Sequence, residues 1–344
     1  MAPRRKVYVA YTGGTIGMKA TGKGYAPEAG YLQGLLADMR ELRDPSMPEI
    51  ALTEYDPLLD SANMMPSDWR RIAVDIAARR HDFDGFVIIH GTDTMAYTAS
   101  ALSYLLMGLG KPVILTGSQV PLCEVRGDAR ENLITSLLVA AECSIPEVCL
   151  YFGGKLLRGN RAQKVSADGF DAFDSPNYPP LGTVGVDVVI HRRRAYLPES
   201  SPLTLEHRAE PFVGEMRIFP GISIPIITNF LKPPLQGLVM ETYGVGNAPD
   251  RDPALLAAIR EACDRGVVIV SVTQCMKGGV HMGEYVTGRH LMEAGVISGY
   301  DLTPEAALTK LYVLFGHGFS PAEVRWFMQR NLVGELTIPV EGGA

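Results

Sequence analysis

Short apolar runs alternate along the chain with longer segments in which apolar residues recur every three to four positions. The short runs are apolar on both faces, which is typical of parallel strands covered on both sides. The longer segments have helical periodicity. The strand-like runs are 7–11, 85–89, 112–115 and 148–152. The helix-like segments are 67–80, 95–107 and 128–141. This alternation predicts an α/β fold with a doubly wound parallel sheet.

The pattern changes from about residue 175, where proline and polar residues replace the regular periodicity. A second α/β series follows, with further apolar runs and helical segments. The runs are 237–240 and 267–272, and the helical segments are 253–264, 304–315 and 321–331. We therefore predict two domains. They are a larger N-terminal catalytic α/β domain at 1–190 and a smaller C-terminal α/β domain at 213–344, joined by a linker at 191–212.

Length and charge restrict the possible classes of function. The chain has 344 residues, of which 47% are hydrophobic, and this is enough for two cores without disulfides. Its formal net charge is -6, whereas nucleic-acid-binding proteins usually present a basic face. We therefore expect no nucleic-acid partner.

Cysteine usage and the N-terminal segment bear on the compartment. The five cysteines have irregular spacing and form no CxxC pair, so they predict neither a disulfide framework nor a zinc site. Three basic residues at 4–6 precede the apolar run 7–11, which is too short for the core of a signal peptide. No stretch reaches the length of a membrane span. We expect a cytoplasmic protein without a membrane partner.

Two predicted strands end abruptly in small and hydroxyl-bearing residues. The segment TGGTIG at 12–17 follows the first strand, and HGTDTM at 90–95 follows the second. Open α/β sheets bind ligands in a crevice at the carboxyl ends of their strands. These segments supply Thr15, Thr92 and Asp93, which makes acyl chemistry the first hypothesis.

Each of these residues also has a simpler structural interpretation. Thr15 alone is more often part of a turn or helix cap, and Asp93 alone is more often a helix cap. His90 alone is compatible with a hydrogen-bonded core histidine. A threonine hydroxyl is a poor nucleophile unless a base lies within hydrogen-bond reach. The presence of Lys164 in LLRGNRAQK, together with Thr92 and Asp93, favours the catalytic interpretation.

Dinucleotide binding is a competing explanation for the first glycine-rich segment. Its fingerprint is G-x-G-x-x-G at the start of a helix. Glycines at 13, 14 and 17 give G-G-x-x-G instead, and the residues that follow predict a mobile loop. We therefore rank nucleotide binding below acyl chemistry.

Taken together, five segments resemble the bacterial-type L-asparaginase family, specifically its cytoplasmic type I branch. They are TGGTIG, DSANM at 60–64, HGTDTM, LRGNRAQK and YGVGNAP at 243–249. The resemblance extends from Val7 to about Leu336. TGGTI and HGTDT are highly specific in combination, so the pair predicts the family more strongly than either motif alone.

The resemblance implies hydrolysis of L-asparagine to L-aspartate and ammonia without a metal or cofactor. In this family's pattern Thr15 takes the position of the nucleophile and Tyr25 that of its activating partner. Thr92, Asp93 and Lys164 match the second catalytic cluster.

The glycine-rich segment 18–31 is interpreted as a mobile lid that closes over the substrate and brings Tyr25 to Thr15. The resemblance also implies that a glutamate from the C-terminal domain of a neighbouring subunit supports the tyrosine. Glu284 is the candidate for that position. A homodimer or homotetramer is therefore expected.

The charges of an amino acid suggest how the substrate is held. Its α-ammonium needs a carboxylate, which Asp93 supplies and Asp60 assists. Its α-carboxylate needs neutral donors such as Ser61. Ser118, in LTGSQ after the third strand, is a further candidate contact, and Thr92 lies close to the expected substrate position.

Two alternatives remain open from the sequence. The same site is compatible with glutamine, D-asparagine or a side-chain amide in a larger molecule. A non-catalytic asparagine sensor would keep the pocket without turnover. The joint presence of Thr15, Tyr25 and Lys164 argues against a sensor, because binding alone does not require the nucleophile and the lysine together.

Overall fold

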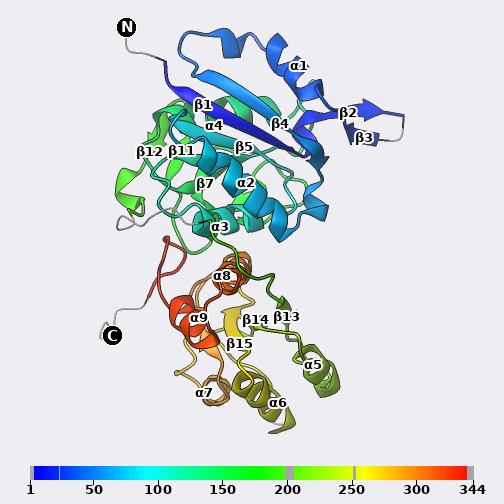
Figure 1. Ribbon diagram of the computed structural model, residues 1–344, viewed down its shortest axis with the longest axis vertical. Helices are drawn as coiled ribbons and strands as arrows, with labels where there is room; N and C mark the ends of the chain where they lie inside the picture. The colour runs from blue at the N-terminus through cyan, green and yellow to red at the C-terminus, as the bar shows by residue number, and fades with distance from the viewer. Residues whose placement is uncertain (1–3, 23, 198–204, 251–252, 339–344) are drawn as a thin grey trace. The chain divides into compact units, whose positions relative to one another are not determined.

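The structure is a computed structural model that describes residues 4–22, 24–197, 205–250 and 253–338. The chain divides into two compact units, Met1–Leu205 and Glu206–Ala344 (Figure 1). Part of the predicted linker, residues 198–204, lies outside the described residues. In the described ranges no helix is both long and apolar enough to cross a membrane.

A mixed sheet of eight strands forms the centre of the first unit, in the order β12-β11-β8-β7-β6-β5-β1-β4. Its parallel part contains β1 (Lys6–Gly13), β4 (Glu49–Leu59), β5 (Gly85–Ile89), β6 (Val113–Thr116) and β7 (Val148–Phe152). Three further strands extend the sheet in antiparallel fashion. They are β8 (Lys155–Arg158), which pairs with β7, β11 (Gly182–Val184), which pairs with β8, and β12 (Val188–Ile190), which pairs with β11. The predicted strands thus form the parallel centre of this sheet.

Helices cover both faces of this sheet. Successive side chains of a strand point to opposite faces, so neighbouring residues of β1 contact different helices. Val7 and Val9 of β1 pack in one core with α1 (Tyr31–Asp38) and α4 (Ala129–Glu142). Between these residues, Tyr8 donates a hydrogen bond of 2.7 Å to Asp75 of α2 (Pro66–Ala78). Helix α3 (Met95–Leu105) packs against α2. The predicted doubly wound architecture is confirmed.

The second unit contains a smaller parallel sheet in the order β13-β14-β15-β16. Its strands are β13 (Val213–Arg217), β14 (Gly237–Thr242), β15 (Val268–Thr273) and β16 (Ile297–Ser298). One face packs against α5 (Ile224–Phe230), α6 (Pro253–Asp264) and α7 (Val286–Glu293). The other face packs against α8 (Pro304–Gly316) and α9 (Pro321–Met328). The predicted second α/β domain is therefore confirmed as a fold.

The segment predicted as a mobile lid is a β-hairpin in the structure. It consists of β2 (Met18–Thr21) and β3 (Gly24–Pro27), which pair antiparallel (Figure 1). An exposed ion pair of 3.1 Å joins Lys19 of β2 to Glu28, the residue after β3. Most residues of this hairpin are exposed, so it lacks the alternation of apolar and polar residues that predicts a half-buried strand.

Candidate active site

The carboxyl ends of β1 and β5 meet where the strand order reverses. The chain passes from β1 to β4 at one edge of the sheet and then returns to β5 on the other side of β1. In open α/β sheets a ligand crevice forms at such a switch point. Thr15 follows β1 and Thr92 follows β5, so both predicted threonines lie at this position.

The turns after β4, β1 and β5 are in direct contact. A Cβ atom built on Gly14 would lie 2.4 Å from the backbone nitrogen of Gly91, and one on Gly91 would lie 2.4 Å from Oγ of Ser61. Thr94 Oγ1 also donates a hydrogen bond of 2.8 Å to the carbonyl of Ser61. Glycine at 14 and 91 therefore allows TGGTIG, HGTDTM and DSANM to form one continuous surface.

The two threonines of TGGT have different environments. Thr12 is 1% exposed, and its hydroxyl donates a hydrogen bond of 2.9 Å to the carbonyl of Ile89. Thr12 thus joins the ends of β1 and β5. Thr15 begins the short 3-10 helix η1 (Thr15–Gly17) and is only half-buried. Of the two hydroxyls, that of Thr15 is the one accessible for chemistry.

Lys164 connects the other two residues of the second predicted cluster, Thr92 and Asp93. It lies on β9 (Gln163–Lys164), which pairs with β10 (Phe173–Asp174). Its Nζ donates hydrogen bonds of 2.9 Å to Thr92 Oγ1 and 2.8 Å to Asp93 Oδ1. An ammonium group this close to a hydroxyl stabilises negative charge that develops there. The structure thus brings together the three residues predicted for this cluster.

Gln119 fixes the hydroxyl of Thr92 and was not identified from the sequence. Thr92 Oγ1 donates to Gln119 Oε1 at 3.3 Å, whereas Gln119 Nε2 donates to the carbonyls of Ala167 (3.1 Å) and Gly169 (3.2 Å). Because the amide hydrogens are directed to these carbonyls, the amide oxygen faces Thr92. The only sequence signal for this role is its position beside Ser118.

The residues predicted to hold the substrate lie at the same edge of the sheet. Asp60 follows β4, and its Oδ1 accepts a hydrogen bond of 3.1 Å from the nitrogen of Ala62, which caps η3 (Ser61–Asn63). Ser61 is buried against Gly91. Ser118 follows β6 and is 1% exposed, and its Oγ has no hydrogen-bond partner among the described residues.

His90 is a buried, hydrogen-bonded core residue. Its Nδ1 lies 2.6 Å from the carbonyl of Gly91, and its Nε2 lies 2.9 Å from Oγ1 of Thr98. Burial lowers the pKa of His90 to about 4, so the ring is neutral at pH 7. A neutral ring that donates from Nδ1 accepts from Thr98 at Nε2. His90 thus supports the turn that carries Thr92.

Tyr25 hydrogen-bonds to a residue that the sequence did not indicate. It lies on β3, and its phenol donates a hydrogen bond of 2.8 Å to Glu124 Oε1. This hydrogen bond is the main cause that raises the pKa of Tyr25, so the phenol keeps its proton at neutral pH. Within the described residues no hydrogen bond joins Tyr25 to Thr15. Glu284, the predicted support of the tyrosine, is an exposed residue of the second unit.

The described residues contain no group of three or more His, Cys, Asp or Glu side chains that could hold a metal ion.

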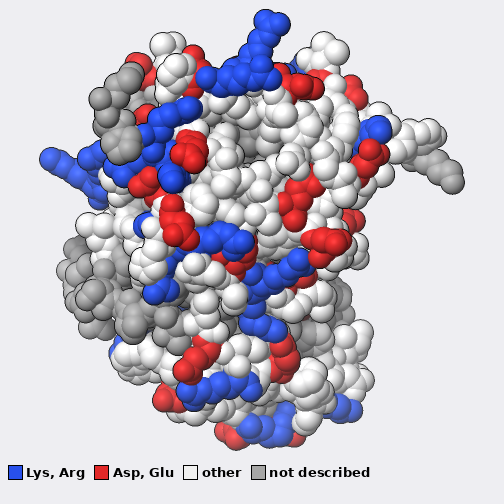
Figure 2. Space-filling model, turned by 45° about the horizontal axis from the view of Figure 1, so that its top comes forward, with Lys and Arg blue, Asp and Glu red and all other residues white. Residues whose placement is uncertain are grey.

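On the face shown in Figure 2, basic and acidic side chains are interspersed rather than separated by sign.

Comparison with known proteins relates this site to a family. The family described as "Asparaginase, N-terminal" matches residues 6–196, and the family described as "Glutaminase/Asparaginase C-terminal domain" matches residues 213–328. The chain is 52% identical to L-asparaginase 1 of Escherichia coli (strain K12) over 338 residues, which is 97% of this chain and 98% of the relative. The chain belongs to the bacterial-type asparaginase family.

Solved structures of other asparaginases share the fold. The crystal structure of L-asparaginase I from Vibrio cholerae has a TM-score of 0.90 at 49% identity, and covers 97% of this chain and 100% of that chain. The thermostable L-asparaginase from Thermococcus kodakarensis has a TM-score of 0.85 at 36% identity, with coverage of 97% and 100%. Both units of this asparaginase chain are therefore included in the similarity.

Gly14→Ala should damage the asparaginase site and the fold together. Gly14 has a φ of +96° and no space for a Cβ atom, so the turns after β1 and β5 would have to separate. We expect a loss of roughly 2–4 kcal/mol in the free energy of unfolding. Displacement of Thr15 should lower ammonia release by about 100-fold or more. Urea unfolding and an ammonia assay measure the two effects.

Gly110→Ala is the matched control for this prediction. Gly110 also has a positive φ, of +72°, but a Cβ atom there meets nothing within 4 Å. Only the backbone strain remains, so we expect a loss of about 1 kcal/mol in stability with unchanged activity. Equal activity in Gly14→Ala and Gly110→Ala would contradict the importance of close contact between the two turns.

Proposed function

We propose that the protein is an L-asparaginase that converts L-asparagine and water to L-aspartate and ammonia. The observation that carries this proposal is the hydrogen-bonded cluster of Lys164, Thr92 and Asp93 at the same switch point as Thr15. Its support from relatives is the 52% identity to L-asparaginase 1 of Escherichia coli, which extends over 97% of the chain.

In the proposed reaction Thr15 is the nucleophile. Its Oγ attacks the side-chain carbonyl carbon of asparagine, the hydroxyl proton of Thr15 passes to the departing nitrogen, the carbon–nitrogen bond breaks, and the nitrogen leaves as ammonia. Water then cleaves the resulting ester, which releases aspartate and restores the Thr15 hydroxyl. Tyr25 is the proposed activating partner of Thr15. Thr92 and Lys164 stabilise the charge that develops during these steps, because Nζ already donates to Thr92 Oγ1.

The charged and polar groups at the sheet edge define the proposed binding site. Asp93 is 63% exposed beside Lys164, so one side of its carboxylate is accessible to the substrate ammonium. In the proposed site Asp60 adds a second negative charge for the substrate ammonium. Ser61 donates a hydrogen bond to the α-carboxylate of the substrate. Ser118 Oγ has no partner among the described residues, so it has a free hydrogen bond to offer a ligand.

Assembly and compartment complete the proposal. We propose a homodimer or homotetramer, as the resemblance to the type I branch implies. We also propose a cytoplasmic location, which is supported by the absence of any disulfide among the five cysteines.

The test is ammonia release from L-asparagine, D-asparagine and L-glutamine by the purified chain. L-Asparagine should be the best substrate, and the extra methylene of glutamine should lower kcat/KM by about 10- to 200-fold. A mock preparation from host cells without the chain controls for contaminating enzymes. Faster release from glutamine would favour a glutaminase, and binding of asparagine without release from any amide would favour a sensor.

A further inference from the structure

The loop after β6 contacts the catalytic turn and the hairpin at three successive residues. Leu122 donates a backbone hydrogen bond of 3.0 Å to the carbonyl of Ile16. Cys123 Sγ lies 3.6 Å from the carbonyl of Met18, where the hairpin begins. Glu124 then accepts the hydrogen bond of 2.8 Å from Tyr25 on β3. Residues 122–124 thus contact the chain at three points between the turn that carries Thr15 and the strand that carries Tyr25.

This loop is itself held in place at both ends. The carboxylate of Asp128 accepts backbone hydrogen bonds of 3.0–3.1 Å from Gln119 and Val120. Asn132 Nδ2 donates to the same carboxylate at 3.2 Å and to the carbonyl of Gly117 at 3.0 Å. These hydrogen bonds join the two ends of the loop, so the backbone that carries Glu124 is held in place.

The hydrogen bond to Glu124 determines what the phenol of Tyr25 can do. Its single hydrogen points to the carboxylate, so its oxygen can only accept a hydrogen bond from a second hydroxyl. β3 lies beside η1, the turn that begins with Thr15. A phenol oriented in this way would accept the hydroxyl hydrogen of Thr15 and leave a lone pair of Thr15 Oγ directed away from the tyrosine, toward the substrate.

We propose that Glu124 is the positioning residue of Tyr25 and acts within its own chain, holding the phenol hydrogen so that the phenol oxygen faces Thr15. The inference rests on the proposed function of Thr15 and Tyr25. It also changes the expected source of support for the tyrosine. The carboxylate comes from the loop after β6 in the N-terminal unit rather than from the C-terminal domain of a neighbouring subunit.

Glu28, the residue directly after β3, is the matched comparison. It is also an exposed glutamate, but it pairs with Lys19 rather than with Tyr25. Glu124→Ala should lower kcat for L-asparagine by about 10- to 100-fold, the usual range for a hydrogen bond to a charged group, with a change in KM below about threefold. Glu124→Gln retains an acceptor oxygen and should lose less. Glu28→Ala should stay within about twofold of the native kcat.

A double-mutant cycle separates positioning of Tyr25 from a general structural effect. In a Tyr25→Phe background, Glu124→Ala should change kcat by less than about twofold, because the group that Glu124 positions is already absent. An equal loss in both backgrounds would overturn the proposal, as would native kcat in Glu124→Ala.

Hydrogen exchange of the hairpin amides gives a readout that does not depend on activity. Glu124→Ala and Tyr25→Phe both remove the same hydrogen bond, so both should accelerate exchange in β2 and β3 to the same extent. Unchanged exchange in both variants would overturn the proposed link. If the native chain released no ammonia while exchange rose as expected, the proposed function would fail and the link between Glu124 and Tyr25 would stand.

Discussion

Replacement of Lys164 by methionine should lower kcat for L-asparagine by about 10²- to 10⁴-fold. Methionine has a similar length but carries no charge and donates no hydrogen bond. The variant therefore loses both contacts of Nζ, at 2.9 Å to Thr92 and 2.8 Å to Asp93. Steady-state ammonia release gives kcat and KM separately.

The split between kcat and KM identifies the role of Lys164. Loss of an interaction that is made mainly in the transition state lowers kcat and kcat/KM together, whereas loss of uniform substrate binding raises KM and leaves kcat unchanged. A raised KM with native kcat would therefore contradict the catalytic assignment. It would place Lys164 in substrate binding only.

Lys155→Met is the matched control. Lys155 lies on β8 and forms an ion pair of 3.1 Å with Asp174. It is 37% exposed, and among the described residues no hydrogen bond or ion pair joins it to Thr92, Asp93 or Lys164. Removal of such a partly exposed pair should change kcat by less than about twofold and stability by less than about 1 kcal/mol. A loss as large as that of Lys164→Met would show that the effect is not specific to the cluster.

The parallel strands were predictable because both of their faces are buried. β5 and β7 consist entirely of buried residues, so each reads as a continuous apolar run between polar turns. β2 and β3 lack that signal because most of their residues are exposed. β11 and β12 are three residues each and also partly exposed, which is too short for a reliable period. Burial thus determines which strands the sequence reveals.

The candidate site was predictable where its residues follow a buried strand. Thr15 and Thr92 follow β1 and β5, and the switch in strand order brings these ends together. Gln119 and Glu124 act through long loops, and their partners lie far away in the sequence. No local pattern indicates such contacts, because they depend on how a loop folds over a neighbouring turn.

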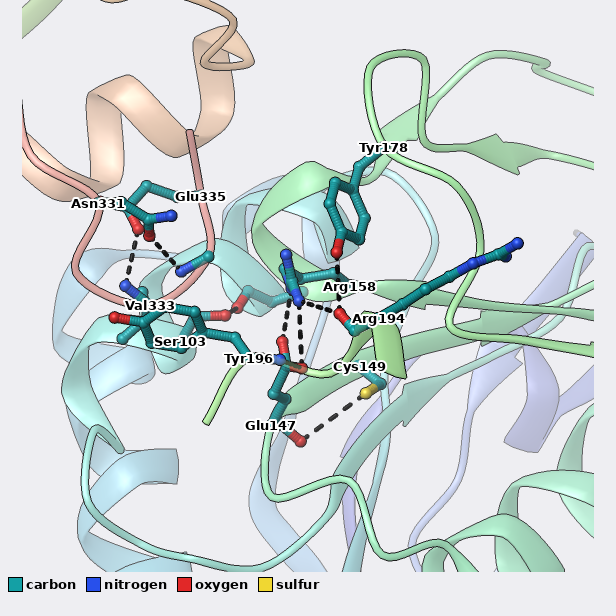
Figure 3. Close-up of polar contacts among 12 residues, drawn as sticks. Ser103, Glu147, Cys149, Arg158, Tyr178, Arg194, Tyr196, Asn331, Val333 and Glu335 are labelled. Atoms are coloured by element: carbon teal, nitrogen blue, oxygen red, sulfur yellow. Dashed lines mark hydrogen bonds and ion pairs between the residues drawn. The ribbon is translucent and has the colours of Figure 1, made fainter. Parts of the chain in front are cut away.

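A buried ion pair joins Glu147, the residue before β7, to Arg158 at the end of β8 (Figure 3). Arg158 Nε donates to Glu147 at 2.6 Å, and both side chains are less than a tenth exposed. Glu147 also accepts a hydrogen bond of 2.6 Å from the backbone of Tyr196, and Arg158 donates to the carbonyl of Arg194 at 2.7 Å. The guanidinium lies 4.3 Å from the ring centre of Tyr178. The pair thus connects β7 and β8 to the segment that leads toward the second unit.

Arg158→Met should lower the free energy of unfolding by about 3–5 kcal/mol at pH 7, because it leaves the carboxylate of Glu147 buried without its counterion. Adding Glu147→Gln should recover a large part of this loss, since the remaining amide is neutral and still accepts from Tyr196. Arg130→Met is the control: its pair with Glu41 is exposed and should cost less than about 1 kcal/mol. Urea unfolding measures all four proteins.

The loss in Arg158→Met should also be smaller at pH 5 than at pH 7. Burial already raises the pKa of Glu147 in the native protein, against the lowering effect of Arg158. Without Arg158 this pKa rises further, so the folded variant binds a proton over a pH range in which the unfolded chain has released it. Stability of the variant therefore falls as pH rises through that range and recovers as pH falls. A loss that is equal at both pH values would mean that packing against Tyr178, rather than the uncompensated charge, accounts for the effect.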